Sequence, residues 1–178
     1  MDAVSLNVFP TAVHIIKTKT WPKYKNFLLD SIKNQQDPAY RPKEGFYTDY
    51  DLKQPWLNKI WGEFIEPEMK VFFDQTHTRR VDIWAQEYIG EADHSAHRHQ
   101  IVGYGCVLYA KFDPEHHTGT TLFRPFLDPN DYTNSNDMFT PEVEEGNILI
   151  FPSWMLHMVK PSKSKVPRVV VAFNLAPK

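Results

Sequence analysis

The most constraining feature of the sequence is a change in the spacing of its apolar residues near Arg80. Before that point, residues 20–35 and 55–75 carry apolar side chains at a helical period. After it, the apolar period shortens to two in segments rich in β-branched and aromatic residues. These segments are residues 81–88, 101–112, 120–126, 147–151 and 166–175. Helices followed by antiparallel strands favour a mainly β, α+β fold, with helices on one outer face of a sandwich or jelly roll.

Three further sequence features predict an edge strand, a break in the second helix and a long loop. Residues 5–16 alternate loosely around Pro10, which predicts an opening edge strand. Pro67 should kink or divide the second helix. Residues 127–145 contain no clear strand and exceed the usual loop length, so they are either a lid over a site or a surface insertion.

Length and composition narrow the class of protein. The 178 residues fit one domain, and a net charge of −2 with both signs dispersed argues against nucleic acid and membrane surfaces as partners. Cys106 is the single cysteine, which excludes an intrachain disulfide. Since neither a long apolar run nor the pattern of a signal peptide is present, we expect a cytoplasmic protein. Oligomeric state is left open.

Histidines gather in the stretch His94-Ser-Ala-His97-Arg-His99. On a strand, His97 and His99 leave the same face and can reach one ion, whereas His94 has the other parity. His157 follows the apolar run that begins at Gly146 and breaks at Pro152. Two imidazoles from one strand and a third from a distant strand would occupy one face of a transition-metal ion. We therefore predict a metal site at His97, His99 and His157.

Other histidines fit this site less well. His94 is expected to be an exposed loop residue rather than a hydrogen-bond partner of the metal ligands. His116 and His117 follow Glu115 in a predicted hairpin and are expected to be exposed to solvent.

An arginine opens the apolar strand that follows the distal histidine. Arg168 precedes Val-Val-Val-Ala-Phe-Asn174, and a buried guanidinium is costly unless an anion meets it. A carboxylate would satisfy it through two parallel hydrogen bonds. The alternative is an arginine that extends to solvent at the mouth of the strand.

These motifs together resemble the small iron(II)- and 2-oxoglutarate-dependent oxygenases, related to prolyl hydroxylases, of marine bacteria and phages. The resemblance rests on three motifs: His-x-His, the run Phe151-Pro-Ser-Trp-Met-Leu-His157-Met-Val, and the strand from Arg168 to Asn174. Asn7-Val-Phe-Pro-Thr-Ala-Val and Tyr104-Gly-Cys-Val-Leu-Tyr-Ala are similar to further segments of that group.

The resemblance implies a double-stranded β-helix over residues 81–178, buttressed by a mostly helical segment at 1–80, in a single domain 1–178. It also implies hydroxylation of a small molecule or peptide side chain, with decarboxylation of 2-oxoglutarate to succinate. His97, His99 and His157 would hold Fe(II). Arg168 would bind the far carboxylate of 2-oxoglutarate, and Tyr109 would donate its hydroxyl to the same group.

One position departs from the pattern of that superfamily, and it keeps alternatives open. Most members have an aspartate or glutamate where this chain has His99. Three neutral imidazoles leave Fe(II) with its full charge, which should strengthen the hold on dianionic 2-oxoglutarate and raise the redox potential. Asp93 or Asp113 could instead supply a carboxylate ligand.

Two other functions compete with the oxygenase. The spacing of Gly146, Pro152 and His157 resembles the second cupin motif, so a cupin-type metal-binding protein or three-histidine metalloenzyme that does not use 2-oxoglutarate is the alternative. A viral jelly-roll structural protein is the third reading, although such a protein has no need for convergent histidines.

Overall fold

The computed structural model describes residues 11–34, 46–48, 54–99, 102–125, 137–162 and 164–178. The strands are β1 (His14–Lys17), β2 (Phe46–Thr48), β3 (Thr78–Tyr88), β4 (His94–His97), β5 (Tyr104–Lys111), β6 (Thr121–Phe123), β7 (Met138–Phe139), β8 (Asn147–Pro152), β9 (His157–Val159) and β10 (Arg168–Pro177). The helices are α1 (Trp21–Lys33), α2 (Pro55–Ile60), the π-helix η2 (Trp61–Ile65), α3 (Glu66–Glu68) and α4 (Lys70–Thr76).

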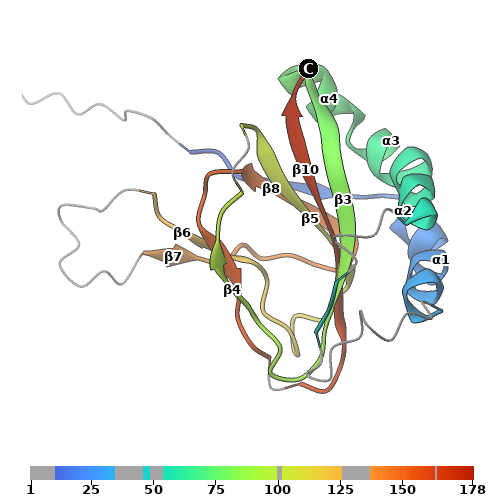
Figure 1. The fold of residues 1–178 in the computed structure, drawn as a ribbon, viewed down its shortest axis with the longest axis vertical. Coiled ribbons are helices and arrows are strands. Elements are labelled where there is room, and N and C mark those ends of the chain that lie inside the picture. The colour runs from blue at the N-terminus through green and yellow to red at the C-terminus, as the bar shows by residue number, and fades with distance from the viewer. Residues whose placement is uncertain (1–10, 35–45, 49–53, 100–101, 126–136, 163) are drawn as a thin grey trace, which may run out of the picture.

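The strands form two antiparallel sheets (Figure 1). The larger sheet has the order β1-β8-β5-β10-β3-β2, and the smaller has the order β4-β9-β6-β7. β10 lies between β3 and β5, so its ladder of hydrogen bonds is paired on both sides. This interleaving of strands from distant parts of the chain is the jelly-roll arrangement that the sequence predicted.

The six-stranded sheet is apolar on both faces. Its outer face packs against the helices in a core that includes Phe64, Leu108, Val171 and Phe173, all fully buried. Figure 1 shows the helices stacked on this side, away from the smaller sheet. The inner face carries a second core with Tyr109, Leu149 and Phe151. The prediction of helices on one outer face is confirmed.

The second predicted helix is divided, and the proline explains part of the division. Pro67 lacks the N–H that an α-helix would use, and the preceding turn is a π-turn in which the N–H of Glu66 donates to the carbonyl of Trp61. The chain then breaks again at Met69, whose backbone is no longer helical. The sequence predicted a kink or division but not the π-turn.

The first eighty residues contribute more than a helical buttress. β1 pairs with β8 and β2 pairs with β3, so both edge strands of the larger sheet come from this part of the chain. The predicted opening edge strand is confirmed at His14–Lys17, whereas its first residues lie outside the described part. No helix in the described residues is long and apolar enough to span a membrane.

The long segment at 127–145 is only partly described. Residues 126–136 lie outside the described ranges, so the choice between lid and surface insertion stays a prediction. Its second part contains β7, which pairs with β6 and which the sequence did not predict.

Candidate metal centre

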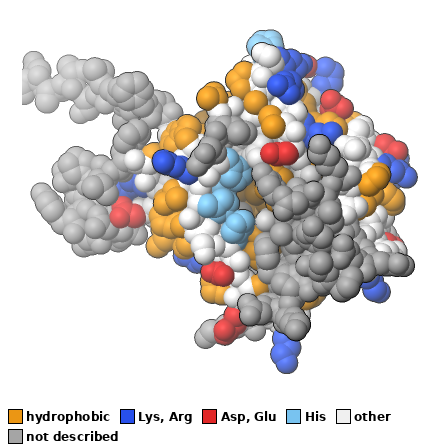
Figure 2. All heavy atoms as spheres, viewed as in Figure 1, with side chains coloured by type: hydrophobic (Ala, Val, Ile, Leu, Met, Phe, Trp, Pro, Cys, Tyr) orange, Lys and Arg blue, Asp and Glu red, His pale blue; other side chains and the backbone are white. Residues whose placement is uncertain are grey.

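Three histidines converge where the two sheets face each other. His97 ends β4 and is paired with His157, the first residue of β9. His99 follows β4, and its backbone N–H donates to the carbonyl of Ser153 at 3.0 Å. One ligand atom from each of the three imidazoles lies within 4.8 Å of the other two. Histidine side chains are visible together on the face of the molecule in Figure 2, beside apolar side chains.

Each of these imidazoles has its Nδ1 beside an oxygen acceptor. The acceptors are the carbonyl of Ser95 for His97 at 2.8 Å, the carbonyl of Met155 for His157 at 2.9 Å, and the side-chain oxygen of Asn174 for His99 at 2.5 Å. An oxygen at Nδ1 favours the tautomer with the proton there. Nε2 of each ring then keeps its lone pair for a metal ion.

Burial keeps two of the three ligands neutral. It lowers the pKa of His157 to about 3, against a smaller opposing effect of the Met155 carbonyl. Burial also lowers the pKa of His99. An imidazole must be neutral to bind a metal, so this lowering of the pKa favours the metal-binding form of His99 and His157.

His94 lies beside these ligands, contrary to the expectation of an exposed loop residue. Its ring stacks on that of His97 with 4.0 Å between centroids, and its Nδ1 is 3.4 Å from the hydroxyl of Tyr88. Burial, followed by the positive charge that His97 and His99 can carry, lowers its pKa to about 4. Strict alternation placed His94 on the opposite face of the strand from His97. That prediction was wrong because the register of β4 against β9 shifts between His94 and His97, as in a β-bulge.

Arg168 lines one small cavity together with the three histidines, and it is buried there with an incomplete set of hydrogen bonds. It is 3% exposed, and its Nη2 donates to the hydroxyl of Thr120 at 3.5 Å. Its Nε and Nη1 are buried without a partner, and no ion pair joins it to a carboxylate of the described residues. The rings of Tyr88 and Tyr109 lie 5.3 and 5.5 Å from the guanidinium carbon. The side chain does not reach solvent, so the alternative of an arginine that extends to solvent is wrong, and an anionic partner stays a prediction.

Tyr109 is inward-facing and fully buried, with its hydroxyl bonded to a residue that the sequence analysis missed. It donates to the side-chain oxygen of Thr120 at 3.0 Å and accepts from the backbone N–H of Thr120 at 3.0 Å. The oxygen of Thr120 therefore accepts from both Tyr109 and Arg168. Its own hydroxyl hydrogen remains available to an anion in the cavity. Direct donation by Tyr109 to a bound anion stays a prediction.

The cavity between the histidines and Arg168 is small. Its volume is about 30 Å³, and its polar lining includes Gln86, Tyr88 and Thr120. That is room for an ion or a water molecule, which needs about 10–15 Å³. A larger organic anion needs side chains at the mouth to move, and such rotamer changes are common on binding.

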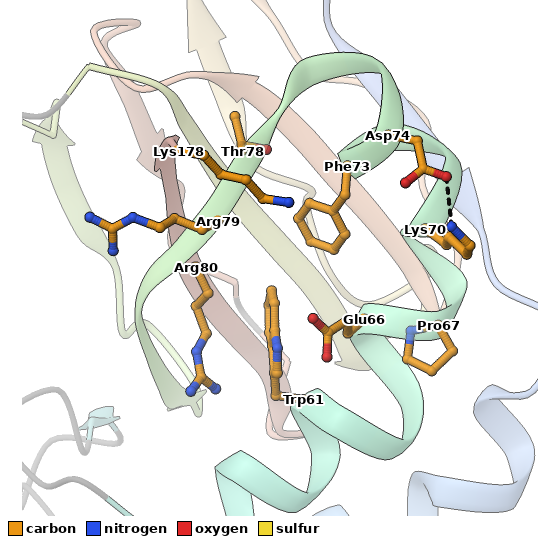
Figure 3. A pocket seen from close by; sticks show the side chains of 10 residues that line it. All are labelled: Trp61, Glu66, Pro67, Lys70, Phe73, Asp74, Thr78, Arg79, Arg80 and Lys178. Carbon is orange, nitrogen blue, oxygen red and sulfur yellow. Dashed lines mark hydrogen bonds and ion pairs between the residues drawn. The ribbon is translucent and has the colours of Figure 1, made fainter.

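A much larger pocket, of about 700 Å³, lies on the helical side of the larger sheet (Figure 3). The guanidinium of Arg80 stacks over the ring of Trp61 at 4.8 Å, and Lys70 and Asp74 form an ion pair at 2.7 Å. No histidine is among the described residues that line it. We take the smaller cavity as the candidate site, because three side chains that can share one ion converge there, and this is a more specific signal than volume.

The remaining candidates do not join the cluster. The described side chains that can share one ion are the three histidines, without Asp93 or Asp113. His116 is exposed, as predicted. His117 is 6% exposed, so its prediction was wrong: Nδ1 accepts from the N–H of Asp113 at 3.0 Å, and Nε2 lies 3.0 Å from the carbonyl of Val166.

Asn174 and Asp82 are further polar residues beside the histidines that the sequence motifs did not single out. Asn174 lies six residues after Arg168 on β10, and alternation along a strand places both on the same face. A polar residue at an inward position of an otherwise apolar strand was the available signal.

Comparison with known proteins agrees with this fold. Residues 82–174, more than half of the chain, match the model of the family described as "Putative 2OG-Fe(II) oxygenase". This chain belongs to that family. No curated protein matches the sequence.

Solved structures with the same fold share little sequence with this chain. The viral collagen prolyl hydroxylase of Paramecium bursaria Chlorella virus-1, in complex with 2-oxoglutarate, is 11% identical with a TM-score of 0.62, over 93% of this chain and 96% of that one. A prolyl-4-hydroxylase of Pseudomonas putida is 11% identical with a TM-score of 0.62, over 94% of each chain. HygX of Streptomyces hygroscopicus, with nickel and 2-oxoglutarate bound, is 10% identical with a TM-score of 0.67, over 94% and 84%. The fold is therefore the double-stranded β-helix of 2-oxoglutarate oxygenases.

Proposed function

We propose that this chain is an Fe(II)- and 2-oxoglutarate-dependent oxygenase that hydroxylates a C–H bond of a small molecule or a peptide side chain. The observation that carries the proposal is the pairing of two features in one cavity. Three imidazoles with an oxygen at each Nδ1 keep Nε2 for a metal, and a buried arginine has two nitrogen atoms without a partner in the described part of the chain. A metal-binding barrel without an organic acid as co-substrate has no use for the arginine.

The side chains that line the cavity fit both a metal ion and 2-oxoglutarate. His97, His99 and His157 would hold the metal, which would activate molecular oxygen as the oxidant, while 2-oxoglutarate would supply two electrons by its decarboxylation to succinate. Arg168 would neutralise the far carboxylate of 2-oxoglutarate, and the Thr120 hydroxyl would donate to the same group. The rings of Tyr88 and Tyr109 enclose the guanidinium, which excludes water and strengthens the charge pairing.

The donor set also fits the charge of the co-substrate. Three neutral imidazoles leave the charge of a divalent ion uncompensated by protein ligands. A dianion can therefore meet a positive centre at each end, the metal ion at one and Arg168 at the other. The prolyl hydroxylases and HygX among the similar structures support peptide and small-molecule substrates respectively, as proposals for this chain.

The test is turnover of 2-oxoglutarate. Wild-type protein with Fe(II), 2-oxoglutarate and oxygen should release succinate slowly without an added substrate, and His157→Ala should release none. Prolyl peptides and small polar molecules are then compared by how much they accelerate succinate release. A wild-type protein that binds metal but yields no succinate with any of them would favour the cupin-type metal protein.

A further inference from the structure

The imidazole of His99 is oriented by a side chain, whereas those of His97 and His157 are oriented by the backbone. Nδ1 of His97 and of His157 each lies beside a carbonyl two residues earlier in the chain. Nδ1 of His99 lies 2.5 Å from the side-chain oxygen of Asn174, which is 75 residues away in sequence. The tautomer of His99 therefore depends on which way the amide of Asn174 points.

Asp82 decides that orientation. Its Oδ2 accepts from the Asn174 side-chain Nδ2 at 3.1 Å, and its Oδ1 accepts from the Asn174 backbone N–H at 3.0 Å. An ionised carboxylate only accepts hydrogen bonds, so the amide nitrogen must face Asp82 and the amide oxygen must face His99. With the amide reversed, an N–H would face Nδ1 of His99, and the proton of the ring would have to move to Nε2.

The local backbone and burial support this arrangement. Asn174 and Asp82 are paired across β10 and β3, and the register of the two strands shifts directly after Asn174. Asn174 is 5% exposed, so water competes little for its amide. A hydrogen bond in such a setting is strengthened by the low local dielectric.

We propose that Asp82 and Asn174 form a relay that holds His99 in the Nδ1–H tautomer and so makes Nε2 of His99 the third metal-binding atom. Both are positioning residues, since Asn174 contacts Nδ1 of His99 and Asp82 contacts Asn174, so that each acts on the metal only through the His99 ring. Partners that bond the remote nitrogen of a ligand histidine fix its orientation and raise its basicity. The inference rests on the metal centre of the proposed function but not on the use of 2-oxoglutarate.

The tautomer can be read directly in the metal-free protein. Long-range ¹H–¹⁵N spectra of the imidazoles distinguish a protonated from an unprotonated ring nitrogen. In wild type we expect His99 to carry its proton on Nδ1. In Asn174→Leu the preference should be lost at His99 and retained at His97 and His157, because the latter two bond to backbone carbonyls. A wild-type His99 protonated on Nε2, or an unchanged tautomer in Asn174→Leu, would overturn the relay.

Metal affinity gives a second, independent measurement. Titration with Ni(II) should show binding to Asn174→Leu weakened by about 10- to 100-fold, the usual effect of removing such a partner. Asp82→Asn should weaken binding in the same direction by less, because an amide at position 82 can still accept one hydrogen bond. It is also the variant to use if Asn174→Leu does not fold.

Asn147→Leu is the matched control. Asn147 is also 5% exposed, and its side-chain oxygen accepts from the N–H of Glu144, but it does not line the histidine cavity. Its substitution should lower the melting temperature and leave Ni(II) affinity unchanged. If Asn147→Leu weakened Ni(II) binding as much as Asn174→Leu, the effect would be general destabilisation and the relay would be wrong.

The two proposals fail in different ways. Wild-type protein that binds Ni(II) tightly but never converts 2-oxoglutarate would refute the oxygenase and leave the relay intact. Equal Ni(II) affinity in wild type, Asn174→Leu and Asp82→Asn would refute the relay, whatever the activity.

Discussion

Replacing Arg168 with methionine should have opposite effects on co-substrate binding and on stability. Two guanidinium nitrogens of Arg168 are buried without a partner among the described residues, so the folded protein without ligand carries an incompletely satisfied charge. Loss of a desolvated charge pair costs about 2–5 kcal/mol of binding free energy. At about 1.4 kcal/mol per tenfold change, 2-oxoglutarate affinity should fall by roughly 30-fold to several thousand-fold.

The ligand-free protein should respond in the other direction. Exchange of buried ionic groups for apolar side chains of similar volume is often neutral or stabilising by about 1–4 kcal/mol. For a chain of this size, each kcal/mol shifts the melting temperature by about 2–4 °C. Arg168→Met should therefore melt at the same temperature as wild type or several degrees higher.

Calorimetric titration of 2-oxoglutarate into the Ni(II)-loaded proteins measures the first effect, and thermal melting of the metal-free proteins measures the second. Ni(II) affinity should not change, because Arg168 is not among the metal-binding side chains. Arg79→Met, which removes an exposed arginine from β3, is the control and should leave 2-oxoglutarate binding unchanged. Wild-type affinity for 2-oxoglutarate in Arg168→Met would remove this residue from the site.

Three further predictions test separate parts of the structure. His99→Asp should retain metal and some succinate release, because a carboxylate can replace the imidazole, whereas His99→Ala should lose most metal affinity; tight Ni(II) binding by His99→Ala would place the third ligand elsewhere. Burial lowers the pKa of His117 in the folded protein, so the unfolded chain takes up a proton at a higher pH than the folded chain does. The free energy of unfolding is therefore unaffected above about pH 6.5 and falls as pH decreases from there toward the lower pKa of the folded state. Melting temperatures between pH 7 and pH 5 should therefore fall more steeply in wild type than in His117→Phe, and parallel curves would contradict this. Gly105→Ala should weaken Ni(II) binding. A Cβ there would lie 2.9 Å from the ring of Phe151, which packs against His157, and 3.5 Å from Nδ1 of His99. Unchanged Ni(II) affinity would show that these rings can move without disturbing the site.

Alternation along strands was enough to predict much of the site. It grouped His97 with His99, and the apolar strand after Arg168 identified a buried cation, whereas Tyr109 came only from the resemblance to the oxygenases. It failed at His94, because a register shift in β4 reverses the parity of one residue, and single-sequence patterns do not reveal such shifts. It also missed β7, a strand of two residues that is too short to show a period.

The burial of His117 and the contacts of Asn174 could not be predicted from the sequence for a different reason. His117 is buried because Val166, 49 residues later, provides its acceptor. Asn174 contacts His99, 75 residues earlier, and Asp82, 92 residues earlier. Contacts between segments so far apart depend on the order of strands in the sheets, which the spacing of apolar residues does not determine.

The two edge strands from the first eighty residues have a consequence for folding yield. Residues 82–174, which match the family, contain all three histidines and Arg168, but on their own they would leave β8 and β3 with bare edges. Unpaired edges and an uncovered apolar face invite pairing between chains and aggregation. We therefore expect the N-terminal strands and helices to protect the barrel against self-association, and a fragment reduced to residues 82–174 to precipitate rather than to fold.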